Sequence, residues 1–237
     1  MAAFAGRDAW SPIGPQGSVG FNSAAFDPVD PSVIYLALQQ WPLQPSNTGG
    51  GVAKSVDGGK TWRTVSEGLP PGGISFLWIS SVDRSLLFAA SGDGYYRSEN
   101  GGSSWTRLAE PIGSDACRQA VEWFCSPLSL SAHEARTVYA ADRTGIFKSI
   151  DAGLSWETLS DPNPASPGAQ HVEADPFHEG CLFALNGREI YRSEDDGRSW
   201  AVPSPGIAGG FGAFWIDRNE ADVLFATNGR ADLFYRS

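Results

Sequence analysis

The sequence is poor in the residue types that hold metals or attack substrates. Among 237 residues there are three cysteines and three histidines. The cysteines form no Cys-x-x-Cys pair, and the histidines (His133, His171 and His178) lack the spacing of a metal-binding pair. A phosphate-binding glycine loop and a Gly-x-Ser-x-Gly nucleophile motif are also absent. We therefore predict no metal and no cofactor.

Positive charge is scarce as well. The 17 basic residues are outnumbered by 27 acidic ones, the formal net charge is -10, and the lysines and arginines form no cluster. Such a chain repels the phosphates of nucleic acids and of anionic membranes, so we expect no nucleic-acid partner. No apolar run is longer than a strand, and we expect no membrane-spanning segment.

A recognisable secretory signal is missing too. Residues 1–10 have neither the charged start nor the long apolar stretch of a leader. A secreted or periplasmic location requires a leader outside this sequence, and the compartment stays open. Whether Cys117 and Cys125 form a disulfide also stays open, whereas Cys181 falls in a strand pattern and is expected in the core.

What the sequence does contain is a repeat. The pattern Ser-x-Asp/Asn-x-Gly-x-Ser/Thr-Trp begins at Ser55, Ser98, Ser149 and Ser193, at intervals of 43 to 51 residues. Each copy follows three short runs of β-forming residues and precedes a fourth, and helical periodicity appears nowhere over a useful length. Units of four short strands repeated at this period are typical of β-propeller blades.

The repeated pattern resembles the Asp-box, also called the BNR repeat. Sialidases, family 74 glycoside hydrolases, sortilin-type receptors and photosystem II assembly factors carry it. The resemblance covers essentially the whole chain and implies an all-β propeller of four-stranded antiparallel blades, with about five blades present. It does not specify an activity.

Hairpin chemistry explains the residues of the box. The Asp or Asn side chain can accept backbone N–H groups in an Asx-type turn, and the following Gly supplies a positive φ. The Trp can lie between blades, where its burial stabilises the fold. The structural Asp-box residues are thus Ser55, Asp57, Gly59, Trp62, Ser98, Asn100, Gly102, Trp105, Ser149, Asp151, Gly153, Trp156, Ser193, Asp195, Gly197 and Trp200.

We expect one domain over residues 1–237. Its blades span approximately residues 18–68, 73–110, 120–161, 168–204 and 207–237, and residues 8–14 around Trp10 resemble a fourth strand whose partners lie elsewhere in sequence. In one arrangement this strand completes the last blade and closes a five-bladed ring. In the other, which we favour, the blades are part of a larger, for example seven-bladed, propeller, because related families usually have more blades.

Function is sought where the units differ. Insertions at Gln39 to Gly50 and at Glu110 to Phe124 fall in loops on the face opposite the Asp-boxes, which the resemblance implies is the binding face. They carry Trp41 and Trp123, whose rings suit sugar stacking or protein contact. Trp78 and Trp215, at equivalent positions of first strands, complete the candidate binding set, although packing beside the central channel is the favoured interpretation of these two.

Catalytic residues are not evident. Glu173 and Glu122 are weak candidates for the paired carboxylates of glycoside hydrolysis. However, where family 74 hydrolases have an Arg-Thr-Asp-x-Gly-Gly run, the first unit reads Ala37-Leu38-Gln39-Gln40 and lacks an acid. The arginine triad of a sialidase is not visible either. We therefore expect a non-catalytic propeller that binds a protein or a glycan, and the alternative is a xyloglucanase-like or sialidase-like glycoside hydrolase.

Overall fold

The computed structural model describes residues 13–15, 20–39, 50–108, 128–142, 144–163, 168–187, 189–202, 210–228 and 233–237. Every regular element in these ranges is a β-strand, and the strands form five antiparallel sheets that follow one another along the chain. The described part therefore includes no helix that could cross a membrane. Each sheet is called a blade below.

The blades repeat one strand order, in which each strand pairs with the next in sequence. Three blades have four strands and two have three within the described ranges. Blade 1 is β1 (Phe21–Phe26), β2 (Ile34–Leu38), β3 (Gly51–Ser55) and β4 (Arg63–Thr64); blade 2 is β5 (Ile74–Ile79), β6 (Leu87–Ser91), β7 (Gly94–Ser98) and β8 (Thr106–Arg107); blade 3 is β9 (Leu128–Leu130), β10 (Val138–Asp142), β11 (Gly145–Ser149) and β12 (Glu157–Thr158); blade 4 is β13 (His171–Ala174), β14 (Leu182–Asn186) and β15 (Glu189–Ser193); blade 5 is β16 (Phe211–Ile216), β17 (Leu224–Asn228) and β18 (Phe234–Arg236).

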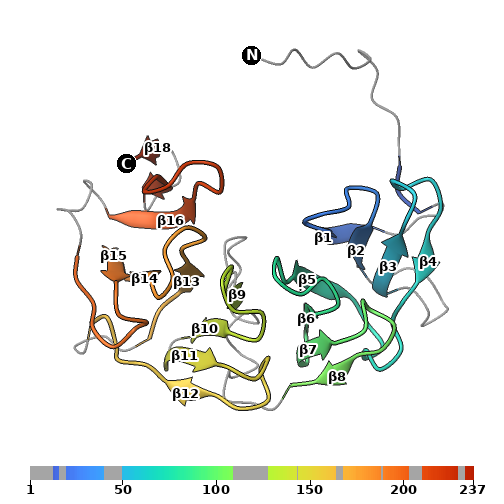
Figure 1. Cartoon of the computed structure of the whole chain (residues 1–237), viewed down its shortest axis with the longest axis horizontal. Coiled ribbons are helices and arrows are strands. Elements are labelled where there is room, and N and C mark those ends of the chain that lie inside the picture. Colours follow the sequence, from blue (N-terminus) through green and yellow to red (C-terminus); the bar gives the residue numbers. More distant parts are fainter. Residues whose placement is uncertain are drawn as a thin grey trace, which may run out of the picture.

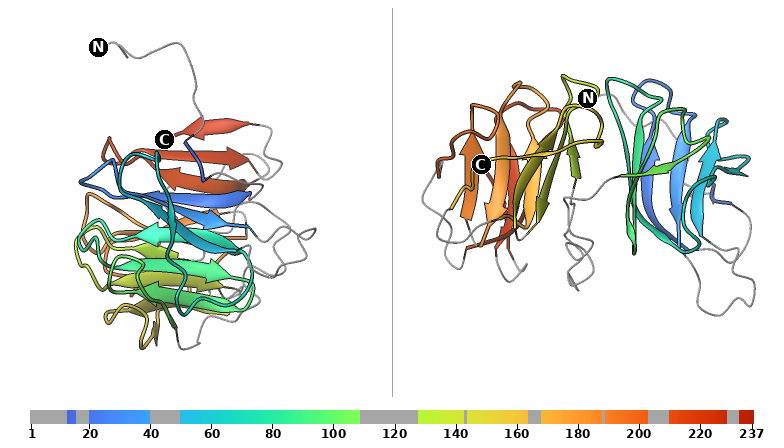
Figure 2. Two further views of the ribbon diagram at one scale, coloured as in Figure 1. Left: turned by 90° about the vertical axis from the view of Figure 1, so that its right-hand side faces the viewer. Right: turned by 90° about the horizontal axis from the view of Figure 1, so that it is seen from below.

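The blades are arranged in an arc around a common centre (Figure 1). The first strand of each blade lies nearest the centre and the last lies at the rim, and the arc is open between blades 5 and 1. Seen from the side, the strands run across the thickness of the disc (Figure 2). This arrangement confirms the predicted all-β propeller of about five blades.

Alternation along the second strands produces the packing between blades. In β6, Leu87 and Ala89 face blade 1, whereas Phe88 and Ala90 face blade 3. Both faces of an inner blade are therefore buried, which explains why β10 and β14 are buried at every position. The fold consequently has a chain of cores, one between each pair of neighbouring blades, rather than one central core.

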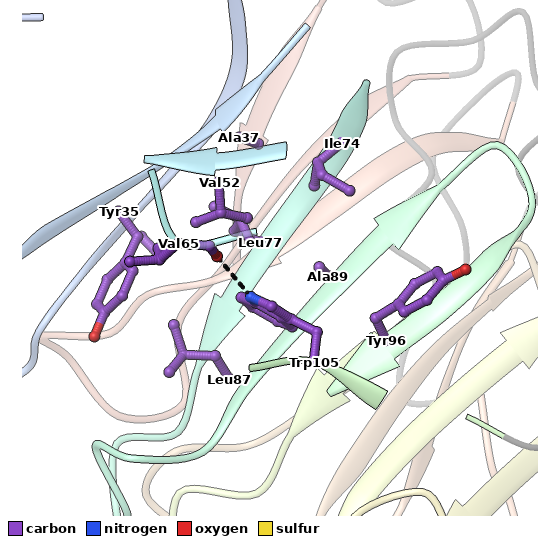
Figure 3. Packing of buried hydrophobic residues seen from close by; sticks show 11 residues of the cluster. Tyr35, Ala37, Val52, Val65, Ile74, Leu77, Leu87, Ala89, Tyr96 and Trp105 are labelled. Carbon is purple, nitrogen blue, oxygen red and sulfur yellow. Dashed lines mark hydrogen bonds between the residues drawn. The ribbon is translucent and has the colours of Figure 1, made fainter. Parts of the chain in front are cut away.

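The core between blades 1 and 2 shows how an Asp-box Trp contributes (Figure 3). Trp105 is 5% exposed, and its indole Nε1 donates a hydrogen bond of 2.8 Å to the carbonyl of Val65 in the preceding blade. At about 25 cal/mol per Å² of apolar surface, burying an aromatic side chain of this size stabilises by at most about 4–6 kcal/mol. The box of one blade thus grips the outer strand of the blade before it.

Residue 13 repeats this contact at the start of the chain. The Trp62 Nε1 donates to the carbonyl of Ile13 at 2.6 Å, and Ile13 lies against Gly59 in the same box. Ile13 therefore takes the place that Val65 takes at the box of blade 2. The predicted pairing of residues 8–14 with the last blade falls mostly outside the described residues and stays a prediction.

Candidate functional site

Antiparallel strand order places the connections of every blade alternately on two faces. The Asp-box face carries the turns between first and second strands and the hairpins between third and fourth strands. The loop face carries the hairpins between second and third strands and the connections between blades. These two faces are the surfaces on which a site can be built.

On the Asp-box face, the box of blade 3 illustrates the local geometry. The Ser149 hydroxyl donates to Asp151 Oδ1 at 2.8 Å and accepts the N–H of Gly153 at 2.7 Å. Asp151 also accepts the N–H and the hydroxyl of Ser155, at 2.9 and 2.6 Å. Ser and Asp together satisfy the backbone donors of the hairpin, and Gly153 has a φ of 85°.

These hydrogen bonds hold the box acids in their charged form. Donation from the hydroxyl and N–H of Thr61 lowers the pKa of Asp57 to about 2. Ser155 and Ser199 lower the pKa of Asp151 and of Asp195 in the same way, also to about 2. An acid that is stabilised as an acceptor is a poor proton donor, so this geometry serves the fold rather than acid catalysis.

In blades 1 to 3, the cation next to the box Ser reaches across to the next blade. Lys54 Nζ donates to the carbonyl of Gly101 at 3.1 Å, as does the hydroxyl of Tyr35. Lys148 pairs with Asp196 at the corresponding position of the next box. Arg97 donates to the carbonyls of Asp151 and Ala152. The recurrence of these cations before the box is visible in the sequence, but their role as inter-blade clamps is not.

On the loop face, the described polar side chains stabilise hairpins. Asp142 Oδ1 accepts the N–H groups of Thr144 and Gly145, at 2.7 and 3.2 Å. The Ser91 hydroxyl bonds to Asp93, and Asn186 Nδ2 bonds to the carbonyl of Gly168. These residues lie at the loop-face ends of the second strands of blades 2, 3 and 4 or in the hairpins that follow them.

The aromatic candidates are divided between described and undescribed parts. Trp41, Trp123 and the acid Glu122 lie outside the described residues. Trp78 stacks on Phe76 with ring centroids 5.8 Å apart and packs on the core between blades 2 and 3. Trp215, at the equivalent position of blade 5, is 39% exposed. Trp78 thus belongs to an interface between blades, whereas Trp215 contacts Phe234 of its own blade.

Glu173 lies in a different place from the one its sequence context suggested. It is the next-to-last residue of β13, which ends on the Asp-box face, and it is 9% exposed between blades 4 and 5. Its carboxylate accepts the N–H of Ile216 at 3.4 Å and pairs with Arg218 at 3.3 Å. Burial raises the pKa of Glu173, and Arg218 opposes this shift. The sequence places Glu173 in a first strand but does not show at which end of that strand it lies. The prediction therefore assigned it to the loop face, whereas it lies near the Asp-box face.

His171 is the second titratable group in this interface. Its ring stacks on Phe214 with centroids 4.7 Å apart, and burial lowers its pKa to about 4. The imidazole is therefore neutral at ordinary pH. Within the described ranges, no three His, Cys, Asp or Glu residues lie close enough together to hold a metal ion.

The blades pack against one another across shared cores, and blades 1 to 4 each have a hairpin fixed by a Ser–Asp or Ser–Asn pair. These features define the chain as an Asp-box β-propeller. No protein-family profile matches it. In sequence it is similar to a xyloglucanase of Paenibacillus sp, with 27% identity over 213 residues that make up 86% of this chain and 17% of the relative. A xyloglucanase of Hypocrea jecorina is 29% identical over 220 residues, 80% of this chain and 24% of the relative.

Solved structures share the fold at lower identity. The GH74 enzyme of Niastella koreensis has a TM-score of 0.64 at 21% identity, over 92% of this chain and 30% of the enzyme. YCF48 bound to D1 peptide has a TM-score of 0.61 at 17% identity, over 92% of this chain and 64% of the other. The chain thus spans less than a third of the length of the two xyloglucanases and about two thirds of YCF48.

Proposed function

We propose that the chain is a non-catalytic binding propeller that recognises an extended β-glucan through its loop face. The observation that carries the non-catalytic part is the position of Glu173. This candidate acid is buried between two blades, accepts a backbone N–H and pairs with Arg218, so it has no free path to a substrate on the loop face. The choice of a glucan rests on the similarity to xyloglucanases over 80–86% of this chain.

The loop face suits such a ligand because the structural contacts between blades are concentrated elsewhere. The box hairpins, the clamps and the box tryptophans all act on the opposite side or at the rim. Side chains in the loops of this face are therefore free to contact a ligand, because the packing between blades does not depend on them. Trp41 and Trp123 belong to the two insertions on this face, and flat aromatic rings stack on the apolar faces of sugar rings.

The test is titration calorimetry of the full chain with xyloglucan oligosaccharides. We expect binding, and we expect Trp41→Ala and Trp123→Ala each to weaken it about tenfold, the loss of about 1.4 kcal/mol from one stacking contact. Ile150→Ala is the matched control, because Ile150 is 67% exposed on the Asp-box face. Unchanged affinity in both Trp variants, or an equal loss in the control, contradicts the proposal. Binding of a peptide instead of the glucan contradicts the choice of a glucan ligand and favours a peptide ligand; a structure of YCF48 bound to D1 peptide has the same fold.

A glycoside hydrolase is the second candidate, favoured by the names of the relatives in sequence. It predicts release of reducing sugar from xyloglucan and loss of that activity in Glu122→Gln. Glu173→Gln serves as the control for burial, because the amide keeps the shape and one acceptor for the Ile216 N–H. Activity that depends on either acid rejects the non-catalytic proposal.

A further inference from the structure

One loop-face position of blade 4 carries a side chain where blades 1 to 3 have none. The residue that begins the third strand pairs with the residue that ends the second strand. It is Gly51, Gly94 and Gly145 in blades 1 to 3 but Glu189 in blade 4. Glu189 is exposed. Because three blades form the same strand pair with glycine, the fold does not require a side chain here, and a functional role is favoured.

A buried tyrosine holds one oxygen of this carboxylate. The Tyr191 hydroxyl donates to Glu189 Oε2 at 2.8 Å, and Tyr191 is only 7% exposed. Burial and the bond to Glu189 raise the pKa of Tyr191, so its hydroxyl stays a hydrogen-bond donor at neutral pH. The anchor restricts the conformations of Glu189. Among the described residues, no donor contacts its other oxygen, Oε1.

Gln170 lies beside the same hairpin and is also anchored at one atom. It directly precedes β13, is exposed, and its Oε1 accepts the N–H of Gly187 at 3.0 Å. Since the partner of a backbone N–H must be the amide oxygen, this bond determines the orientation of the side-chain amide. The Nε2 group then has two N–H donors, and no acceptor contacts it in the part of the chain that the structure describes.

The two side chains leave blade 4 on the same side. Side chains alternate along a strand, and Ile190 packs toward blade 5, so Glu189 faces blade 3. Val172 packs on blade 3, and Gln170, two residues earlier, faces the same way. Their backbones are separated by β14, that is by two strand spacings or about 10 Å (Figure 1). Gln170 reaches across part of this distance to the hairpin, so one ligand can contact both side chains.

We propose that Glu189 and Gln170 form a subsite for one neutral sugar unit, in which Glu189 Oε1 accepts a hydroxyl hydrogen and Gln170 Nε2 donates to a hydroxyl oxygen. A sugar hydroxyl is both donor and acceptor, so neighbouring hydroxyls satisfy both groups. A carboxylate has no hydrogen to donate to Glu189 and is repelled by it, so the subsite selects neutral sugars over uronates. As part of a glucan site on the loop face, the subsite rests on the proposed function.

The first test does not depend on xyloglucan. Proton–nitrogen NMR follows the side-chain amide of Gln170, assigned with Gln170→Ala, while methyl β-glucoside or methyl β-glucuronide is added to the full chain. We expect the glucoside to shift this signal in a saturable way, the glucuronide to bind several-fold more weakly, and Glu189→Ala to remove the response to the glucoside. A signal that neither sugar shifts, an equal response to both sugars, or a response that survives Glu189→Ala overturns the proposal.

Titration calorimetry with xyloglucan oligosaccharides then connects the subsite to glucan binding. We expect Glu189→Ala to weaken the affinity about tenfold, the loss of one hydrogen bond to a charged group. Tyr191→Phe is expected to weaken it less, because the carboxylate loses only its anchor. Asp93→Asn is the matched control: this acid of the blade 2 hairpin is also held by a tyrosine, Tyr96, but its other oxygen is bonded to Ser91.

The outcomes separate the subsite from the proposed function. Glu189→Ala is expected to fold, since blades 1 to 3 have glycine at this position. Unchanged affinity in this variant, together with weaker binding in Trp41→Ala and Trp123→Ala, rejects the subsite and leaves the proposed function standing. If the wild-type chain binds no xyloglucan oligosaccharide, the proposed glucan ligand is rejected, and the titration of the Gln170 amide still decides whether the subsite exists.

Discussion

The interface between blades 3 and 4 has the same sheet geometry as the outgoing face of blade 5, the side of that blade that carries Trp215, Phe225, Phe234 and Arg236, but the two have opposite environments. Ile146 and Phe234 hold the same register position, yet one is 0% and the other 66% exposed. Lys148 and Arg236 also correspond, and one reaches the next box whereas the other contacts its own blade. The comparison teaches that the strand pattern of a blade determines which side chains point toward its neighbour. Those side chains contribute to stability only where a neighbouring blade buries them.

The sharpest way to test this comparison is a pair of truncations. Ile146→Ala leaves a cavity between two blades and is expected to destabilise by about 2–5 kcal/mol. Phe234→Ala removes a larger side chain at the equivalent position, yet a surface substitution costs about 0.5 kcal/mol or less. Urea unfolding followed by circular dichroism measures both. Equal losses would show that the outgoing face of blade 5 is already covered in solution.

Acidification tests the buried interface between blades 4 and 5. Because burial lowers the pKa of His171 to about 4, the unfolded chain binds the proton more tightly. The contribution of neutral His171 to the free energy of unfolding is fully present above about pH 6.5. It is lost as the pH falls toward 4, and the total loss is up to about 3 kcal/mol. His171→Phe keeps a ring against Phe214 and is expected to remove this pH dependence. If the free energy of unfolding of the variant falls with pH as steeply as that of the wild type, the pH dependence comes from another group.

Much of the fold could be predicted from the sequence because its cause is local. Each box contains its own turn chemistry, as in the Ser149–Asp151 pair, and the four copies report the blade period directly. Placement of Glu173 was less successful, because depth along a strand and contact with the next blade are not local properties. The clamp formed by Lys54 was missed for the same reason: its acceptor, the carbonyl of Gly101, lies 47 residues away.

The clamps provide a smaller test of the same contrast. Lys148→Met removes the partner of the partly buried Asp196 and is expected to cost about 1–3 kcal/mol. Tyr139 still donates to Asp196 at 2.6 Å, which limits the loss. Arg236→Met, at the exposed equivalent, is expected to be nearly neutral in the parent chain. Thermal unfolding of both variants measures the two effects. Similar decreases in Tm would show that the buried interface between blades 3 and 4 and the outgoing face of blade 5 do not differ in this respect.

The smallest effect is expected from the box acids, which have the same hydrogen bonds in blades 1, 3 and 4. With a pKa of about 2 in the fold, Asp57, Asp151 and Asp195 stabilise the protein above about pH 4 and lose that contribution as the pH falls toward 2. Asp151→Asn mimics the natural Asn100 and is expected to make acid unfolding slightly less steep. Titration of the unfolding midpoint between pH 4 and 2 provides the measurement, with Asp222→Asn on an exposed turn as the control. If the unfolding midpoint of Asp151→Asn falls more steeply with pH than that of the wild type, Asp151 is not the source of this acid sensitivity.

The grip of the Trp105 box on the outer strand of the preceding blade has a consequence for how such a chain can change over evolutionary time. Trp105 holds the strand after Trp62, so a hereditary duplication that starts at a box copies one complete joint between blades rather than one complete blade. Lengthening a connection on the other side disturbs no joint. In the sequence, both long insertions, at residues 39–50 and 110–124, fall between strands that are joined on that side, so the architecture separates the part of the gene that must be copied faithfully from the part that is free to diversify.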